Sequence, residues 1–327
     1  MGTDNVAISV RDLVKVYHPR TGTPVRALDG LTLNVRRGEI FGLLGRNGAG
    51  KTTLLRILTT LTPPTSGSVS VLGLDLGREG LEIRKSLCVV LQENAVELYL
   101  SVADNLATYA RFHSVSATER LARAERVMDQ FGLTEYRNQK VIDLSGGLKR
   151  RVQVAKVFMV DKPIVFLDEA TTGMDPINKR ATLNAVRDQA RIGRTIFLTT
   201  HILEEAEELC DTIAIIDHGR VIASGGLPKI KSMIPGAFDV SITFESLPEE
   251  TLQEIRLLPL LKCSTMRNTV EARVQGDDFS TLETLAGLAR RSHVIHFEVR
   301  SATLEDVFVE LLGPGQRPHN DGGEGRP

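Results

Sequence analysis

The 327-residue sequence has few cysteines and almost no net charge. Its three cysteines, Cys88, Cys210 and Cys263, lie far apart, which argues against a disulfide framework or a zinc site. We expect all three to be buried thiols in a reducing compartment. Forty basic and forty-one acidic residues leave a net charge of -1, so charge gives no support to a nucleic-acid partner.

Long apolar runs are also absent, and none approaches the roughly 20 residues that a membrane helix needs. The N-terminal residues MGTDNVAISVRDL lack the basic and then apolar regions of a signal peptide. We therefore expect a protein of the cytoplasm, held at a membrane only by another polypeptide. The length predicts two domains.

The first 230 residues predict an α/β domain with a mostly parallel sheet, because short apolar runs alternate with segments of helical period. Runs without charge predict strands that are covered on both faces at residues 40–44, 164–167, 195–198 and 213–216. Helical patterns dominate between residues 93 and 150. We interpret this segment as a helical subdomain inserted into the sheet domain.

Residues 236–313 have a different rhythm. Apolar residues alternate over 238–244, 270–274 and 295–299, and a further strand-like segment lies near 260–266. Helical spacing follows the first of these four strands and the third. The order βαββαβ predicts a small α+β domain of the split-βαβ type. Thr303 and Asp306 have the spacing of a capping box at the start of a last helix. The composition of residues 314–327, PGQRPHNDGGEGRP, predicts a disordered tail.

The segment GRNGAGKTT at residues 45–53 fits the phosphate-loop pattern, between an apolar strand and a helix predicted to begin at Lys51. Its backbone N–H groups would surround phosphate oxygens, Lys51 would reach the terminal phosphates of ATP, and Thr52 would offer a hydroxyl to Mg²⁺. The alternative is a glycine-rich turn with a chance lysine. The expected nucleotide-binding residues here are Gly45, Arg46, Asn47, Gly48, Ala49, Gly50, Lys51, Thr52 and Thr53.

A second candidate segment is PIVFLDEATTGMDP, in which an apolar strand ends at Asp168. That position places a carboxylate at the sheet edge where a phosphate-bound Mg²⁺ would lie. Glu169 could then orient and deprotonate the attacking water. An isolated Asp-Glu pair is more often a solvated loop, but the phosphate loop makes the catalytic interpretation the stronger one.

The run LSGGLKRR at residues 144–151 closely resembles the LSGGQ signature of ABC ATPases. The resemblance implies a P-loop NTPase fold with an antiparallel β subdomain beside the parallel sheet. It also implies that two subunits dimerise head to tail. Ser145, Gly146 and Gly147 of one subunit would then contact the ATP that Lys51 of the other holds.

The resemblance extends over nearly the whole chain and implies roles for four more residues. Tyr17 would stack on adenine, although ordinary strand packing is the alternative. Gln92 would contact Mg²⁺, Asp175 would belong to the D-loop, and His201 would lie near the γ-phosphate. An isolated histidine is often only a surface residue. The functional interpretation of His201 rests on its place directly after the predicted strand that begins at Thr195. We expect the acidic run after it, in ILEEAEEL, to be a solvated helix face.

Two residues depart from the family pattern. Leu148 replaces the usual glutamine, from which we expect an altered rate and not a loss of activity, and Met174 replaces the leucine before Asp175. A hydrophobic residue at 148 followed by a basic cluster resembles the ATPases of the daunorubicin-resistance type. These also carry a small C-terminal domain that ends in a motif like SATLEDVFVELLG, and the resemblance implies that this domain regulates or stabilises the dimer.

This resemblance implies the motor of an exporter at the cytoplasmic face of the membrane, driving a separate integral-membrane permease with about six spans. The exported molecule would be a hydrophobic drug, a lipid or a glycan. Its identity does not follow from this sequence, because the motor would contact only ATP and its partners. Three alternatives stay open: a soluble ABC protein that acts on ribosomes or DNA, an importer motor, and a P-loop enzyme that phosphorylates a small molecule. The sequence shows neither a second nucleotide domain nor a long coiled coil, and small-molecule kinases lack the signature.

Overall fold

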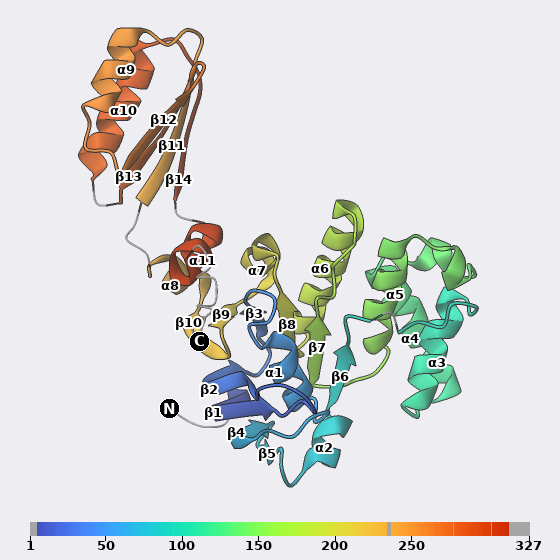
Figure 1. The fold of residues 1–327 in the computed structure, drawn as a ribbon. Coiled ribbons are helices and arrows are strands. Elements are labelled where there is room, and N and C mark those ends of the chain that lie inside the picture. The colour runs from blue at the N-terminus through green and yellow to red at the C-terminus, as the bar shows by residue number, and fades with distance from the viewer. Residues whose placement is uncertain (1–4, 94, 234–236, 277, 302, 314–327) are drawn as a thin grey trace, which may run out of the picture. The chain divides into compact units, whose positions relative to one another are not determined.

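The computed structural model describes residues 5–93, 95–233, 237–276, 278–301 and 303–313 (Figure 1). The chain forms two compact units, residues 1–226 and 227–327. The predicted disordered tail, residues 314–327, lies outside the described residues. No helix in the described ranges is long and apolar enough to cross a membrane.

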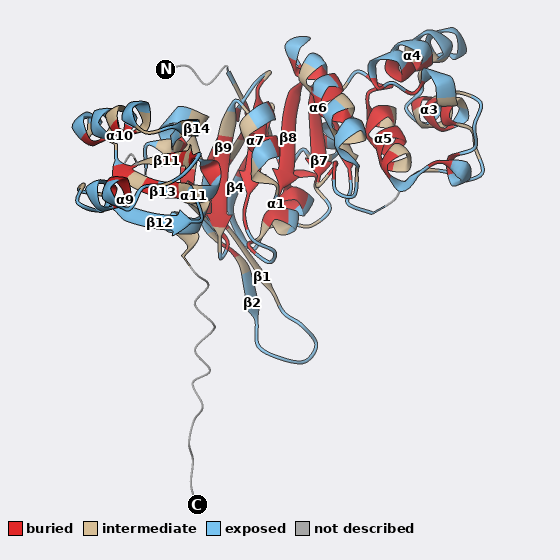
Figure 2. Cartoon of the chain, turned by 90° about the horizontal axis from the view of Figure 1, so that it is seen from above, coloured by how far each residue is buried: buried red, intermediate tan, exposed pale blue. Residues whose placement is uncertain are grey.

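A six-stranded sheet forms the centre of the first unit, in the order β10-β9-β3-β8-β7-β6. All neighbouring pairs are parallel except β9 and β10. Figure 2 shows β7 and β8 buried along their length, as their unbroken apolar sequences predict. The strands are β3 (Ile40–Leu44), β6 (Leu87–Val90), β7 (Ile164–Asp168), β8 (Thr195–Thr200), β9 (Thr212–Asp217) and β10 (Arg220–Gly225).

Each face of this sheet has its own apolar core. On one face, Phe41 and Phe197 stack with ring centroids 5.3 Å apart and pack with α1 (Lys51–Leu58) and an antiparallel sheet. On the other face, Val165 and Ile196 pack with α5 (Gly146–Val157), α6 (Pro176–Arg191) and α7 (Leu203–Leu209). The alternation of side chains along each strand therefore serves two separate cores.

The antiparallel sheet has the order β2-β1-β4-β5 and confirms the β subdomain that the resemblance implied. Its register is irregular, with several shifts between β1 and β2. The helix α2 (Gly80–Lys85) leads from this sheet to β6. The strands are β1 (Val6–Tyr17), β2 (Val25–Arg36), β4 (Ser66–Val71) and β5 (Leu74–Asp75).

Helices dominate the segment between β6 and β7. Ser101 and Ser116 cap α3 (Val102–Phe112) and α4 (Ala117–Gln130), because each hydroxyl accepts a hydrogen bond from a first-turn N–H group. Two short 3₁₀ helices, Thr134–Tyr136 and Val141–Asp143, then lead into α5. Apolar residues of α3, α4 and α5 share one core with the sheet.

The second unit has the predicted βαββαβ order, and its antiparallel sheet runs β12-β13-β11-β14. The helices α9 and α10 lie on one face of the sheet (Figure 1), over Val240, Ile242 and Val270. The short helix α8 (Leu227–Lys231) contacts α11 (Leu304–Leu312), which has the predicted capping box between Thr303 and Asp306. The other elements are β11 (Ala237–Phe244), α9 (Glu249–Arg256), β12 (Lys262–Met266), β13 (Thr269–Gln275), α10 (Phe279–Arg291) and β14 (Val294–Ser301).

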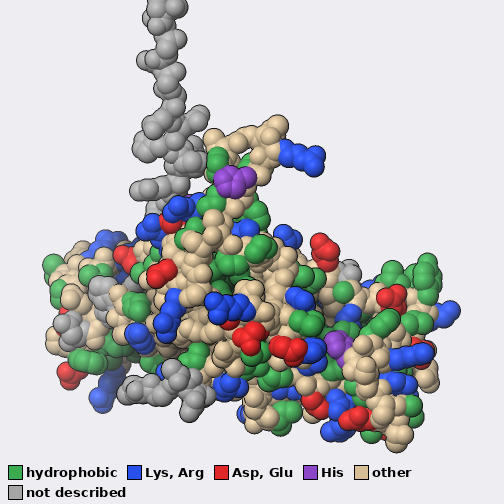
Figure 3. Space-filling model, turned by 90° about the horizontal axis from the view of Figure 1, so that it is seen from below, with side chains coloured by type: hydrophobic (Ala, Val, Ile, Leu, Met, Phe, Trp, Pro, Cys, Tyr) green, Lys and Arg blue, Asp and Glu red, His purple; other side chains and the backbone are tan. Residues whose placement is uncertain are grey.

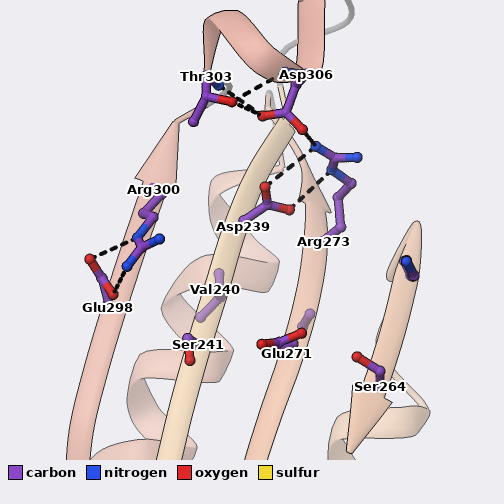
Figure 4. A pocket seen from close by; sticks show the side chains of 12 residues that line it. Asp239, Val240, Ser241, Ser264, Glu271, Arg273, Glu298, Arg300, Thr303 and Asp306 are labelled. Carbon is purple, nitrogen blue, oxygen red and sulfur yellow. Dashed lines mark hydrogen bonds and ion pairs between the residues drawn. The ribbon is translucent and has the colours of Figure 1, made fainter. Parts of the chain in front are cut away.

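The other face of this small sheet is polar and is shown in Figure 4. Arg273 lies between Asp239 and Asp306, at 3.1 and 2.8 Å, and so connects the sheet to the start of α11. Arg300 donates two hydrogen bonds of 2.8 Å to Glu298. These charges are paired with one another, which is typical of a structural network more than of a reactive site.

The prediction that all three cysteines are buried is wrong for Cys263. Cys88 is buried, and burial raises the pKa of its thiol to about 11. Cys210 is partly buried, whereas Cys263 is exposed. The reason is that β12 lies at the edge of the small sheet, where all five of its residues are exposed.

Candidate active site

Four neighbouring parallel strands end at one edge of the six-stranded sheet, and a predicted site residue follows each of them. The phosphate loop follows β3, His201 follows β8, Asp168 ends β7, and Gln92 follows β6. Because the carboxyl ends of parallel strands share an edge, residues far apart in the sequence meet there.

The phosphate loop runs so close to other backbone that two of its positions admit only glycine. A Cβ atom on Gly45 would lie 2.5 Å from the carbonyl oxygen of Ile216. Gly50 has a φ of 108°, and a Cβ atom there would lie 2.7 Å from the carbonyl oxygen of Ala27. The helix α1 begins at the next residue, Lys51, so its free N–H groups face the loop.

Lys51 is buried, and its ammonium group faces backbone oxygens. Its Nζ donates to the carbonyl oxygens of Gly45 at 2.7 Å and of Arg46 at 3.2 Å. Burial lowers the pKa of Lys51, and the nearby charges of Glu169 and Asp168 oppose this shift. A buried ammonium group that is hydrogen-bonded to carbonyl oxygens is well suited to bind an anion such as a phosphate.

Glu169 is the residue at which the predicted catalytic groups converge. Its Oε2 accepts a hydrogen bond of 3.3 Å from Nε2 of Gln92, and its Oε1 lies 3.2 Å from Nδ1 of His201. Its φ of 45° is in the left-handed region, which is uncommon for glutamate and is found more often at functional sites. The N–H group of Glu169 is held by the hydroxyl and the carbonyl oxygen of Thr199, at 3.2 and 3.1 Å.

Asp168, Thr52 and Gln92 supply the types of ligand that Mg²⁺ prefers, namely a carboxylate, a hydroxyl and an amide oxygen. Asp168 is buried and its Oδ1 accepts a hydrogen bond of 2.5 Å from Thr199. No group of three His, Cys, Asp or Glu side chains in the described ranges could hold a metal by itself. The residues therefore fit a Mg²⁺ ion that is held by few side chains and by phosphate oxygens, the usual arrangement for this ion.

The signature residues lie at the start of α5. Ser145 caps this helix, with its hydroxyl 3.3 Å from the N–H group of Leu148. Asp175 caps α6 in the same way, and its hydrogen bonds from Asn178 lower its pKa. A Cβ atom on Gly147 would lie 3.2 Å from Oδ2 of Asp175, so the signature and the D-loop are adjacent within one subunit.

The helix α5 contacts β6, whereas the phosphate loop follows β3, three strands away. At about 4.8 Å between neighbouring strands, these two strands are separated by roughly 14 Å across the sheet. One subunit therefore presents its signature and its phosphate loop on different parts of its surface.

Comparison with known proteins identifies the family. Residues 28–172 match the family described as ABC transporter. The chain is 36% identical over 321 residues to the daunorubicin resistance ATP-binding protein DrrA3 of Streptomyces coeruleorubidus, covering 96% of this chain and 98% of that protein. The chain belongs to the ABC transporter ATP-binding proteins.

Two further similarities describe relatives of this ABC ATPase. It is 33% identical over 310 residues to the Nod factor export ATP-binding protein I of Cupriavidus metallidurans, covering 95% of this chain and 98% of that protein. A dimeric ATP-binding cassette, solved in a post-hydrolysis state with ADP and Pi bound, is 25% identical with a TM-score of 0.61. That alignment covers 67% of this chain and 98% of the other. These findings confirm the predicted fold class and the ATPase assignment.

The structure gives Tyr17 and Leu148 ordinary packing contacts. Tyr17 is half-buried on β1, opposite Val25, and Nζ of Lys15 lies 5.0 Å from the centre of its ring. Its contact with adenine stays a prediction. Leu148 packs on the apolar core of the helical subdomain, which explains how the ABC ATPase accommodates a hydrophobic residue there.

Sequence reasoning missed Glu205, because the run ILEEAEEL looks like a solvated helix face. That prediction is wrong for Glu205, which is only 3% exposed. Its carboxylate accepts hydrogen bonds from Thr171 at 2.6 Å and from Thr200 at 3.1 Å, and it lies 2.8 Å from Nζ of Lys179. Glu205 thus connects the loop after Glu169 to the strand before His201.

We predict that Glu205→Gln lowers the free energy of unfolding by about 2 kcal/mol, because the partly buried Lys179 then lacks its buried counter-charge. Chemical denaturation would measure this change. Glu204→Gln is the matched control, because Glu204 is exposed on the same helix, and it should change the value by about 0.5 kcal/mol or less. Equal effects of the two substitutions would contradict a structural role for Glu205.

Proposed function

We propose that this ABC ATPase is the motor subunit of an exporter and that two copies close head to tail around two ATP molecules. The observation that carries the proposal is the division of the site. Gln92, Asp168, Glu169 and His201 meet at the edge next to the phosphate loop, whereas Ser145 lies on the far helix α5. A second copy in the opposite direction would complete each site.

In the proposed mechanism, Lys51 and the N-terminus of α1 bind the terminal phosphates of ATP. Mg²⁺, held by Thr52, Asp168 and Gln92, would neutralise charge on the phosphates. The carboxylate of Glu169 orients the attacking water and accepts its proton. Gln92 and His201, at 3.3 and 3.2 Å, hold that carboxylate in place.

A second copy would contribute Ser145 and Gly147 to the γ-phosphate. The N-terminus of α5 carries free N–H groups and a partial positive charge, which favour an anion. The γ-phosphate would then be bound by both subunits, so its loss on hydrolysis would remove contacts from both and open the dimer.

We propose that the second unit, residues 227–327, stabilises the closed dimer.

The permease would dock on an apolar patch formed by Leu98, Tyr99 and Ile142. These side chains are 41%, 77% and 39% exposed, and the N–H group of Ile142 donates to the carbonyl oxygen of Leu98 at 2.8 Å. Leu98 and Tyr99 follow Gln92 closely in the chain, so a permease helix bound to the patch would be linked to the proposed Mg²⁺ site through this short segment. Exposed aromatic and aliphatic side chains of this kind are typical of protein interfaces.

The proposed substrate is a drug-like molecule, a lipid or a glycan, by similarity to relatives named for daunorubicin resistance and for Nod factor export. The working place would be the cytoplasmic face of the membrane. Charge gives no support to a nucleic-acid partner, because the net charge is -1 and acidic and basic side chains are intermixed on the face shown in Figure 3.

We predict that Glu169→Gln retains ATP binding, loses nearly all hydrolysis and accumulates as an ATP-bound dimer, because the substitution removes only the proton acceptor. Light scattering with and without ATP and Mg²⁺ should show a doubling of mass. A mass that does not respond to ATP would contradict the proposed dimer of isolated motors.

We predict that Tyr99→Asp keeps the hydrolysis rate of the isolated protein but weakens its retention by a co-expressed permease at least about 10-fold, because a charge replaces a buried interface aromatic. Affinity purification of the permease measures this retention. Phe112→Asp is the matched control, because Phe112 is an 84% exposed aromatic at the far end of α3. Equal retention of the two variants would place the docking surface elsewhere.

A further inference from the structure

The side chain of Arg150, on α5, joins two segments that carry catalytic residues. It is only 6% exposed, and its guanidinium group lies among backbone carbonyl oxygens. Nε and Nη2 bind the segment at the end of β7, and Nη1 binds the segment after β6. The acceptors are Ala170 at 3.0 Å, Asp168 at 2.9 Å, Glu169 at 3.1 Å, Leu91 at 2.7 Å and Gln92 at 3.2 Å.

Gln153, one turn further along α5, fixes this arrangement. Its Oε1 accepts a hydrogen bond of 2.9 Å from Arg150, and its Nε2 donates to the carbonyl oxygens of Leu91 at 3.0 Å and Glu93 at 2.6 Å. Gln153 is 1% exposed. The segment around Gln92 is therefore held to α5 by two buried side chains.

Only a guanidinium group can make this set of contacts. Its five N–H donors form a rigid planar fork, whereas a lysine carries one compact ammonium group that cannot reach both segments at once. A neutral apolar replacement would remove the Arg150 donors from the buried carbonyl oxygens of Ala170 and Asp168. These contacts are to backbone oxygens, so they fix the backbone of Gln92 and Glu169 and do not occupy the side chains of these two residues.

The same helix begins with the signature. Ser145 caps α5 five residues before Arg150, a distance of about 7.5 Å along a rigid helix. A shift of the signature would therefore move Arg150. Arg150 would in turn move the backbone of Gln92 and of Glu169, whose side chains are hydrogen-bonded to each other.

We propose that Arg150 is a positioning residue that couples the location of the signature helix to the geometry of Gln92 and Glu169. Within one subunit, it holds the water-activating carboxylate in its working place. The second role rests on the proposed head-to-tail dimer. When ATP binds at the signature of one chain, Arg150 passes the resulting shift of α5 to the catalytic groups of the same chain, which act on the other ATP.

Arg151 provides a matched control. It is the next residue of α5 and is equally buried, at 6% exposed. Its Nη1 donates to the carbonyl oxygens of Phe131 and Gly132, at 3.2 and 3.3 Å, and both of these acceptors lie in the helical subdomain. Arg151 therefore shares the helix, the charge and the burial of Arg150 but not its hydrogen bonds to the segments that carry Gln92 and Glu169.

The test compares Arg150→Lys and Arg151→Lys in the full-length chain, with measurements of the thermal midpoint, the Kd for ATP, kcat and the Hill coefficient for ATP. We expect Arg150→Lys to lower kcat about 10- to 100-fold, because misplaced catalytic groups have effects of this size. The Kd for ATP should stay unchanged, since the phosphate loop is intact, and the Hill coefficient should fall toward 1. Arg151→Lys should leave both kcat and the Hill coefficient at the wild-type values.

Two results would overturn the proposal. One is a kcat of Arg150→Lys equal to that of Arg151→Lys. The other is a parallel loss of kcat, ATP affinity and thermal midpoint in both variants, which would indicate only a general structural role. If Arg150→Lys does not fold, Arg150→Gln is measured in its place. Turnover and ATP-dependent mass of the wild-type protein, recorded in the same series, report separately on the proposed function.

Discussion

The parallel pairing of β3, β8, β7 and β6 is the constraint on which the site depends. It brings four segments, which are spread over more than 150 residues of sequence from Gly45 to His201, to one edge of a sheet that is buried on both faces. Glu169 follows one of these strands in a left-handed conformation, held by the backbone and hydroxyl of Thr199 on the next. The strain of that conformation is tolerated because the surrounding hydrogen bonds fix it.

A second layer of buried polar side chains supports this edge. Arg150 reaches it from α5 and Glu205 reaches it from α7, and both contact backbone or hydroxyl groups beside the proposed catalytic residues. Each is a charged group in an apolar interior, where unpaired charge is costly, so the helices that carry them must keep their places. The active site and the helix packing are in this way parts of one structure.

The sequence alone predicted the elements whose signals are local. Unbroken apolar runs identified the buried strands, the glycines of the phosphate loop identified the start of α1 at Lys51, and alternation identified the βαββαβ order of the second unit. What it could not predict is burial that arises from contacts between distant elements. KRR and EEAEE are typical of solvated helix faces, yet Arg150 and Glu205 are buried. Conversely, free cysteine is usually buried, yet Cys263 is exposed on the edge strand β12.

If a signature completes the site of the opposite subunit, two variants that are each inactive should restore activity when they are mixed. Lys51→Ala removes phosphate binding, and Ser145→Asp keeps a good helix cap but places a negative charge where the phosphate would bind. Each variant alone should be inactive and their mixture should hydrolyse ATP, because a mixed dimer has one site with both an intact phosphate loop and an intact signature. A mixture no more active than the sum of its separate components would mean that the two subunits do not share a site.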